Sequence, residues 1–411
     1  MEINNDVWEL SRVVFNYPSI DNHAHALLRS EFRDAFQFEG LITESQSTRG
    51  LTEDAPTTLA CYRATAQLAK LYGLSPNSDW ESIKSFRRAA QYENLCRSCL
   101  EPTRIQCILI DDGLGGGDRD KLNDYSWHDQ FTGAPTKRIV RIETIAEELL
   151  MKAMDEQIMA NNVVPGELWT SFEARFTGAL SALGQDPAVA GFKSIVCYRT
   201  GLAVAVPPDK SQVERVIMTM ILVYAARRTL RLADKFVNDY AVNVAMRVAG
   251  ECDKPVQFHT GLGDSDITLA LASPALLQPL VKAYPGTKVV LLHAAYPFTR
   301  EAGYLTSVYD NVFLDFGEIF PFVSADGQRD TLKQVLELAP TNKILWSTDG
   351  HFWPESYYLG SVQARQCLFE VLEGSLRRFE LTLPQAVGIA RRALFENANR
   401  IYNLGLEPRV A

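Results

Sequence analysis

The sequence lacks both an apolar run long enough to cross a membrane and an excess of basic residues. No stretch reaches the roughly 18 to 20 uninterrupted apolar residues that a membrane helix needs. The opening segment MEINNDVWEL has no basic region before an apolar core, so we expect neither a signal peptide nor a transit peptide. A net charge of -9 argues against nucleic acid or an anionic membrane as a partner. We therefore expect the partner to be a small-molecule substrate.

The sequence also lacks the paired cysteine spacing of a zinc ribbon. Its 7 cysteines are an odd number, and Cys96 and Cys99 form a C-x-x-C pair that no second pair accompanies. This favours two helix residues near one face over a pair of metal ligands. Unpaired cysteines are typical of a reducing compartment, so we expect a cytoplasmic protein.

Histidine is scarce, yet five of the 6 histidines lie at or just past the ends of short apolar runs, and an aspartate closes another run. Neutral imidazole and carboxylate are the usual ligands of a catalytic divalent metal. These residues are His23, His25, His259, His293, His351 and Asp349. Their placement suggests a metal-dependent hydrolase.

Eight short apolar runs are predicted to be parallel strands, because strands buried on both faces read as continuous runs of Val, Ile and Leu. They are residues 19–23, 104–111, 138–142, 191–198, 255–259, 288–293, 311–315 and 343–347. Helical patterns separate most of them, at 144–160, 168–183, 211–250, 274–284, 299–309, 325–337 and 357–377, and a further one follows at 382–404. This alternation predicts an α/β fold, a (β/α)8 TIM barrel formed as one domain over residues 1–411.

The first connection, residues 26–102, is far longer than a usual loop between a strand and a helix. It contains helical patterns at 57–72 and 80–95, so we expect a helical insertion after the first strand. An insertion at this point would lie over the mouth of the barrel, as a cap or a subunit contact. A homo-oligomer is therefore expected.

His23 and His25 are two residues apart, which places both side chains on one face of a strand, where they can bind the same ion. An HxH pair on its own is a weak signal of a metal site. A single histidine such as His259 or His293 is more often a hydrogen-bonded core residue, and Asp349 on its own could cap the following helix. Taken together, and at the ends of the first, fifth, sixth and eighth strands, they favour a metal site. His351 and His128 are better interpreted as loop residues than as ligands.

Lys193 lies on the fourth predicted strand and Arg199 at its end, and each has two interpretations. A buried lysine can be neutral and add carbon dioxide to form a carbamate that bridges two metal ions. The alternative is a lysine that contacts substrate or pairs with a carboxylate. Arg199 could bind a substrate carboxylate through its fork of donors, or form a structural salt bridge.

The segments IDNHAH, GFKSIVCYRTGL, QFHTGLGDSDITLALASPALLQPLV, VVLLHAAYPFTREAGYL and STDGHFWPE resemble the amidohydrolase superfamily. The closer resemblance is to the amidohydrolase-2 type domain at the N-terminus of FluG-like and nodulin/glutamine-synthetase-like proteins. Those fusion proteins continue into a synthetase-like domain, whereas this sequence ends at Ala411, so we expect a hydrolase-like domain on its own.

The resemblance implies one or two divalent ions, zinc or a similar metal, with His293 as a further ligand or an electrophile near the substrate. The ligands would be His23, His25, His259 and Asp349, with Lys193 joining them if it is a carbamate. It also implies hydrolysis of a C–N bond, such as an amide or γ-glutamyl amide. The same subfamily includes non-oxidative decarboxylases of aromatic acids, so the fold does not fix the reaction.

We expect Asp349 to move the proton between water and the leaving amine, with His293 stabilising the oxyanion. Groups expected to contact an acidic substrate are Arg199, Tyr198, Asp264, Asp266 and His351. A decarboxylase is the first alternative, for which Arg199 and the aromatics Phe316, Phe320, Phe322 and Trp353 would suit the substrate. A catalytically silent signalling barrel is the second.

Overall fold

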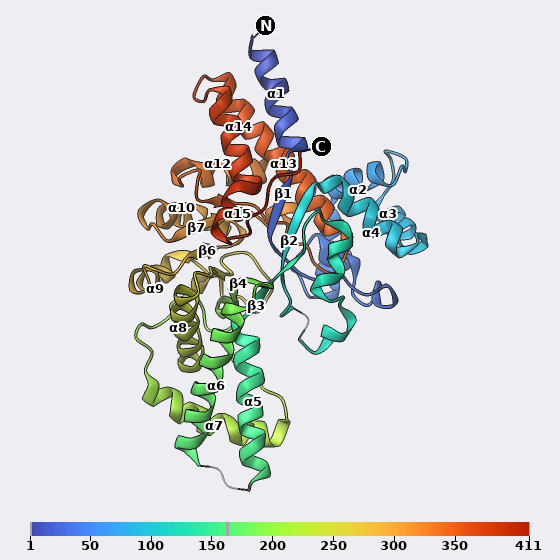
Figure 1. Ribbon diagram of the computed structural model, residues 1–411. Coiled ribbons are helices and arrows are strands. Elements are labelled where there is room, and N and C mark those ends of the chain that lie inside the picture. Colours follow the sequence, from blue (N-terminus) through green and yellow to red (C-terminus); the bar gives the residue numbers. More distant parts are fainter. Residues whose placement is uncertain (1, 115, 162–163, 411) are drawn as a thin grey trace.

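A computed structural model describes residues 2–114, 116–161 and 164–410 and contains a barrel of eight parallel strands (Figure 1). Each strand pairs with the next one in sequence, in the order β1 to β8. The strands are Ser19–Ala24 (β1), Ile105–Asp111 (β2), Lys137–Arg141 (β3), Val189–Ser194 (β4), Val256–Phe258 (β5), Val289–Leu291 (β6), Val312–Asp315 (β7) and Ile344–Leu345 (β8). The predicted TIM barrel is therefore confirmed.

The seam between β8 and β1 is joined by hydrogen bonds rather than by a regular ladder. Asn22 N donates to Trp346 O at 3.3 Å, Asp349 N donates to His23 O at 3.1 Å, and His25 N donates to Gly350 O at 2.7 Å. The backbone that follows β8 is therefore held directly beside the HxH segment of β1.

Strand β4 ends at Ser194, four residues before the predicted end at Tyr198. Ser194 Oγ and Ile195 N both donate to the Glu143 carboxylate, at 2.6 and 3.1 Å. Because these groups bond to a side chain, the ladder stops, and Val196–Tyr198 form a 3-10 turn (η8).

Helices surround the barrel, and several of the predicted helices are divided in the structure. The pattern at 211–250 forms Lys210–Arg227 (α7) and Lys235–Glu251 (α8), because Arg228 is left-handed at φ 55° and the Asp234 side chain caps α8. The remaining outer helices are Ile142–Met159 (α5), Pro165–Gln185 (α6), Gln278–Ala283 (α9), Thr299–Val308 (α10), Ile319–Phe322 (α11), Ala325–Leu338 (α12), Pro354–Arg377 (α13), Leu383–Arg391 (α14) and Asn397–Ile401 (α15).

The segment between β1 and β2 contains three helices, Leu59–Leu71 (α2), Trp80–Ala89 (α3) and Tyr92–Leu100 (α4). The pattern at 80–95 is interrupted because Ala90 and Gln91 are extended and the Gln91 side chain accepts from Asn94 N. Most of this segment packs into a second, smaller core that includes Phe38, Trp80 and, from the β8 side, Trp353.

Two buried contacts hold this helical segment to α13. Glu355 Oε1 of α13 accepts from Arg87 Nε at 2.9 Å and from Tyr72 OH at 2.8 Å. Arg87 also reaches Asp34 at 3.1 Å. The segment is therefore attached to the helix that follows β8, beside the carboxyl ends of the strands.

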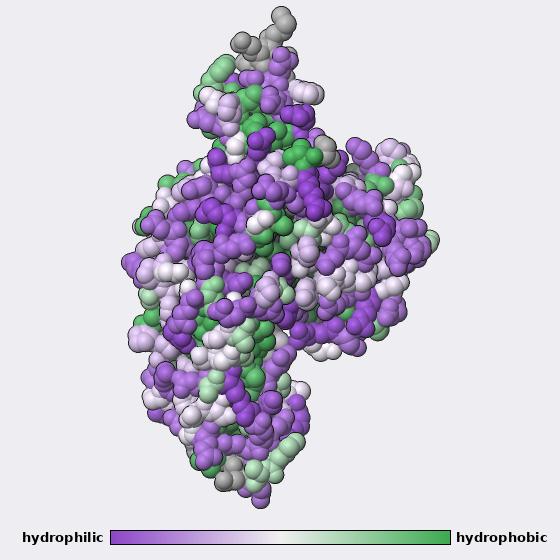
Figure 2. Space-filling view, in the orientation of Figure 1, coloured by the Kyte–Doolittle hydropathy of each residue, from purple (hydrophilic) through white to green (hydrophobic). Residues whose placement is uncertain are grey.

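Helices α5, α6 and α7 extend away from the barrel as a separate lobe at the bottom of Figure 1. At the opposite end, Glu2–Asn16 (α1) packs against α13 and α14. Hydrophilic residues predominate on the face in Figure 2. Among the described residues, no helix combines the length and apolarity that a membrane crossing requires.

Candidate metal centre

A cavity of 280 Å³ lies at the carboxyl ends of the barrel strands, and nearly all the predicted site residues line it. These are His23, His25, Lys193, Tyr198, Arg199, His259, Asp264, Asp266, Asp349 and His351. His293 is 1% exposed and lies against the rings of His23 and His259, at centroid distances of 5.5 and 4.4 Å. The structure thus brings together residues that are far apart in the sequence.

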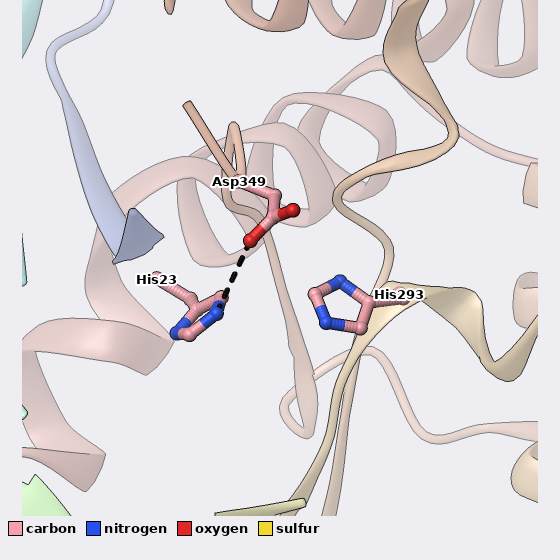
Figure 3. A group of neighbouring side chains, drawn as sticks. All are labelled: His23, His293 and Asp349. Atoms are coloured by element: carbon pink, nitrogen blue, oxygen red, sulfur yellow. Dashed lines mark ion pairs between the residues drawn. The ribbon is translucent and has the colours of Figure 1, made fainter. Parts of the chain in front are cut away.

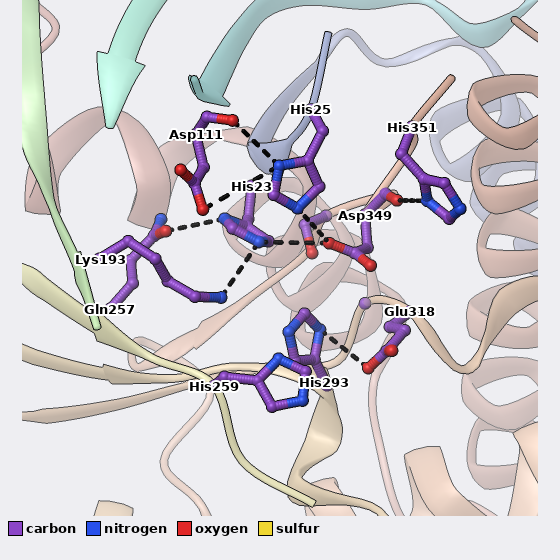
Figure 4. A network of polar contacts seen from close by, with 12 residues as sticks. His23, His25, Asp111, Lys193, Gln257, His259, His293, Glu318, Asp349 and His351 are labelled. Carbon is purple, nitrogen blue, oxygen red and sulfur yellow. Dashed lines mark hydrogen bonds and ion pairs between the residues drawn. The ribbon is translucent and has the colours of Figure 1, made fainter. Parts of the chain in front are cut away.

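His23 of β1 and His25, which directly follows β1, both direct Nε2 toward one oxygen of Asp349. His23 Nε2 lies 3.2 Å and His25 Nε2 3.4 Å from Asp349 Oδ1 (Figures 3 and 4). With zinc–ligand distances of about 2.0–2.1 Å, two ligands on one tetrahedral ion lie about 3.3 Å apart. These separations therefore suit two ligands of one ion.

Hydrogen bonds at the other ring nitrogens fix the tautomers of the pair. His23 Nδ1 donates to Gln257 Oε1 at 2.8 Å, and His25 Nδ1 donates to the Asp111 carbonyl at 3.0 Å. Each Nε2 then carries a lone pair that faces the cavity. Such partners beyond the ligands orient metal-binding imidazoles in general.

Burial keeps the imidazoles of His23, His259 and His293 neutral. It lowers the pKa of His23 to about 4 and holds the pKa values of His259 and His293 well below their usual range. Burial opposes ionisation of Asp349, but the neighbouring histidines His23 and His25 outweigh it and hold the pKa of Asp349 well below its usual range. Neutral imidazoles beside an ionised carboxylate are the protonation states that a divalent metal requires.

Lys193 lies on the cavity floor and is 2% exposed. Its Nζ is 3.2 Å from His23 Nε2, and burial lowers the pKa of the amine to about 8. Arg141 lies nearby and binds Asp111 Oδ2 through Nη2 at 2.6 Å and Nε at 3.1 Å. Burial alone would raise the pKa of Asp111, but Arg141 and His25 outweigh it and hold that pKa below its usual range.

The groups expected to contact substrate lie on the outer wall. Arg199 Nε has no hydrogen-bond partner among the described residues. Tyr198 packs on the His259 ring at 4.3 Å, and His351 Nδ1 donates to the Asp349 carbonyl at 2.9 Å. Asp264 accepts from Gln46 Nε2 at 2.8 Å. The arginine therefore has donors available for a ligand, whereas Asp264 is already engaged by the helical segment after β1.

Several residues of the cavity escaped the sequence analysis. Asp111, beside the cavity, ends one predicted strand, and Arg141 lies one residue before the end of another, so their positions carried a signal. Glu318 lies three residues past the end of β7, and Glu44 comes from the long segment after β1, where no periodicity marked either of them. Burial raises the pKa of Glu44 to about 8, with Asp349 and Asp264 adding to the shift.

Other residues have structural roles. His128 is buried, and its Nε2 accepts from Leu27 N at 3.1 Å. Phe316 and Phe320 belong to the main hydrophobic core, and Trp353 to the smaller one. These three aromatic side chains are therefore directed to packing, which removes much of the basis for an aromatic substrate.

The donor set fits a divalent cation on three grounds. Overlapping groups of His and carboxylate atoms lie within 4.8 Å of one another, and one of them is His23, His293 and Asp349. Neither ring nitrogen of His293 finds a hydrogen-bond partner among the described residues. The set combines neutral nitrogen with anionic oxygen, the chemistry that zinc prefers.

Comparison with known proteins identifies the family of the chain. The family model described as Amidohydrolase matches residues 199–404, a region that contains His259, His293 and Asp349. The chain belongs to the amidohydrolase family. This family is metal-dependent, in keeping with the histidine and carboxylate cluster of this amidohydrolase barrel. The HxH pair and Lys193 precede the matched region and meet it only in the folded barrel.

Relatives agree with this assignment. The chain is 42% identical over 421 residues to the protein fluG of Emericella nidulans, covering 97% of this chain and 47% of that protein, so it spans about half the length of this curated relative. A Lactobacillus casei protein inferred to be a metal-dependent hydrolase has a TM-score of 0.80 at 25% identity, covering 96% and 97% of the two chains. A uronate isomerase from Bacillus halodurans, with a TM-score of 0.66 at 13% identity and 98% and 97% coverage, shares the fold.

Proposed function

We propose that this chain is a metal-dependent amidohydrolase that cleaves a C–N bond, such as an amide or γ-glutamyl amide, in a small acidic substrate. The observation that carries the proposal is the convergence of His23 Nε2 and His25 Nε2 on Asp349 Oδ1, in a cavity that also holds Arg199. A bound divalent ion, for which we propose zinc, acidifies water and polarises a carbonyl group. His23, His25, His259 and Asp349 are the proposed ligands, with Lys193 beside them.

Asp349 is the proposed proton carrier. Its side chain is 12% exposed, so it reaches the cavity, and Nε2 atoms of two histidines lie 3.2 and 3.4 Å from one of its oxygens. The carboxylate accepts a proton from the attacking water and returns it to the nitrogen of the leaving amine. Its lowered pKa keeps it ionised, and therefore able to accept that proton, at neutral pH.

His293 and the outer wall have the remaining proposed roles. His293 stays neutral through burial and can donate a hydrogen bond to the oxygen of a tetrahedral adduct. Arg199 binds a substrate carboxylate, and Tyr198, Asp264 and His351 orient the rest of the molecule. The free donors of Arg199 favour an acidic substrate over a neutral one.

We also propose a cytoplasmic location and a homo-oligomeric state. All seven cysteines are free and six of them are buried, as is usual in a reducing compartment. The helical segment after β1, residues 26–102, is the proposed cap over the cavity of a single domain and the proposed subunit contact.

The test compares the metal-replete wild type with Asp349→Asn on a panel of N-acyl and γ-glutamyl amides, with amine and carbon dioxide release both measured. Amine release should fall by about 10²- to 10⁴-fold in the variant, the usual contribution of a positioned acid–base group. Asp330→Asn, an exposed carboxylate on α12, is the matched control and should retain full activity. Near-wild-type turnover by Asp349→Asn, or carbon dioxide release without amine, would overturn the proposal.

A further inference from the structure

Glu44 lines the cavity together with Asp264 and Asp266, and it differs from both in how its carboxylate is engaged. Asp264 accepts from Gln46 Nε2 at 2.8 Å and from Asp266 N at 2.9 Å. Asp266 in turn binds Arg231 Nη2 at 2.6 Å. Within the described chain, no hydrogen bond or ion pair engages the carboxylate of Glu44, which is therefore available to a ligand.

The segment that carries Glu44 is anchored to the loop after β5. Gln46 Nε2 donates to Asp264 Oδ2 at 2.8 Å, and Ser265 Oγ donates to Gln46 Oε1 at 3.1 Å. Glu44 lies two residues before this anchor and reaches the cavity. The helical segment after β1 therefore contributes a charged side chain to the cavity and fixes its place by contacts with the barrel.

The surroundings of Glu44 favour a cationic ligand. Burial disfavours the negative charge of Glu44, and the charged groups near it, Asp349 and Asp264, are carboxylates that repel it. A carboxylate in such surroundings is neutralised either by a proton or by a bound cation. A positively charged ligand group would stabilise the ionised form of Glu44 and remove the repulsion.

An ammonium group suits Glu44 better than a metal ion does. Among the described residues, Glu44 belongs to none of the groups of His, Cys and carboxylate atoms that are close enough together to hold a metal. A catalytic zinc ion takes three protein ligands, whereas an ammonium group can donate each of its N–H bonds to a separate acceptor. A single buried carboxylate is therefore sufficient for an ammonium group.

The cavity offers a complementary group for the opposite charge. Arg199 lines the same cavity, and its Nε has no hydrogen-bond partner among the described residues. Asp264 interacts electrostatically with both Glu44 and Arg199, which places these two groups on the same side of the cavity. An available carboxylate and an available guanidinium near each other match a ligand that carries an ammonium group beside a carboxylate.

We propose that Glu44 binds the ammonium group of a substrate whose carboxylate binds Arg199, so that the substrate is an α-amino acid derivative. This inference rests on the proposed function, because it takes the cavity as the place where an amide is cleaved. It selects a γ-glutamyl amide with a free α-amine over an amide that carries only a carboxylate. Glu44 is thus a residue that determines specificity, and it is supplied by the segment after β1.

The test compares the hydrolysis of γ-glutamyl anilide with that of glutaryl anilide, which lacks only the ammonium group, in wild type, Glu44→Gln and Glu53→Gln. The wild type should prefer γ-glutamyl anilide in kcat/KM. In Glu44→Gln this preference should fall by about 10- to 100-fold, the usual effect of losing a hydrogen bond between charged groups. Glu53→Gln is the matched control, an exposed carboxylate of the same segment that pairs with Arg49, and it should keep the preference.

Calorimetric titration with glutamate and with glutarate supplies a readout that does not depend on turnover. The wild type should bind glutamate more tightly than glutarate, and Glu44→Gln should lose this difference while circular dichroism shows that it is folded. Equal affinities in the wild type, or a difference that persists in Glu44→Gln, would overturn this inference and leave the proposed hydrolase standing.

The remaining outcomes separate the two proposals. Loss of bound zinc in Glu44→Gln, measured by elemental analysis, would overturn the inference by identifying Glu44 as a metal ligand. A preference for glutamate that depends on Glu44, without hydrolysis of either anilide, would support the role of Glu44 and count against the proposed hydrolase.

Discussion

Gln257 determines which nitrogen of His23 faces the cavity. Its Oε1 accepts from His23 Nδ1, while its Nε2 donates to the Asn22 carbonyl at 2.7 Å and to Tyr402 OH at 2.7 Å. The amide therefore cannot rotate without breaking three hydrogen bonds. This orientation keeps a lone pair on His23 Nε2, the atom that lies beside Asp349.

We predict that Gln257→Leu weakens metal affinity by about 10- to 100-fold, the usual effect of removing a partner of a ligating histidine. The change leaves His23 free to adopt the wrong tautomer. Competition with a zinc-sensitive dye measures the effect. Tyr402→Phe is the control, since it removes an acceptor of Gln257 but keeps the bond to His23, and its affinity should stay within a few-fold of wild type.

An equal loss of affinity in Gln257→Leu and Tyr402→Phe would contradict this assignment. It would show that the packing of the whole network, rather than the tautomer of His23, controls the site.

At the level of elements, α13 is the support of the helical segment after β1. Glu355 is 0% exposed and accepts from both Arg87 of α3 and Tyr72, which follows α2. A buried carboxylate that loses its cationic partner is strongly destabilising, because the remaining charge is neither solvated nor paired. This buried ion pair is therefore one of the contacts that attach the segment to the barrel.

Arg87→Met should lower the free energy of unfolding by about 3–5 kcal/mol, the usual cost of breaking a buried ion pair from one side. Urea denaturation measures it. The control is Arg377→Met, on the helix α13 that carries Glu355. The ion pair between Arg377 and Glu373 lies at the surface and should contribute at most about 1 kcal/mol. Similar unfolding midpoints for the two variants would refute the importance of the Arg87–Glu355 pair.

Elements could be predicted from the sequence where burial produces a hydrophobic pattern. Their boundaries could not be predicted where a single capping residue ends or begins an element. All eight strands were predicted, because runs such as CILID and VVLL are apolar on both faces. The division of the 211–250 helix was missed, since it depends on one left-handed residue, Arg228, and on the Asp234 cap. The early end of β4 was missed for a similar reason, as Glu143 of another element terminates it.

The candidate site was predictable only in part. In a parallel barrel, the strand ends share one face, so polar residues there can be expected to meet. His23, His25, His259 and Asp349 followed from that rule, whereas Lys193 was predicted to lie early in the fourth strand. All five line the cavity. Glu318 and Glu44 lie in connections whose paths depend on packing, and no repeat in the sequence indicates that such residues turn inward.

For the whole molecule, metal removal should lower thermal stability as well as abolish activity. A ligand that binds only the native state, at a free concentration of about 1,000 times its Kd, raises the free energy of unfolding by about 4 kcal/mol. We expect the Tm to fall after treatment with chelator and to recover on zinc addition, as measured by calorimetry. Asp349→Asn should show a much smaller difference between the two conditions. Identical Tm values for wild type with and without metal would argue against binding in this cavity.

The hydrogen-bonded seam of the barrel has a consequence for biosynthesis. Thr348 N donates to Asp21 Oδ1 across 327 positions of sequence, and His23 and His25 meet Asp349 at the same seam. Contacts this distant form late, because a long loop must close before they can be made. A chain still emerging from the ribosome thus carries His23 and His25 without Asp349, and the proposed metal site is complete only when the last strand joins the first.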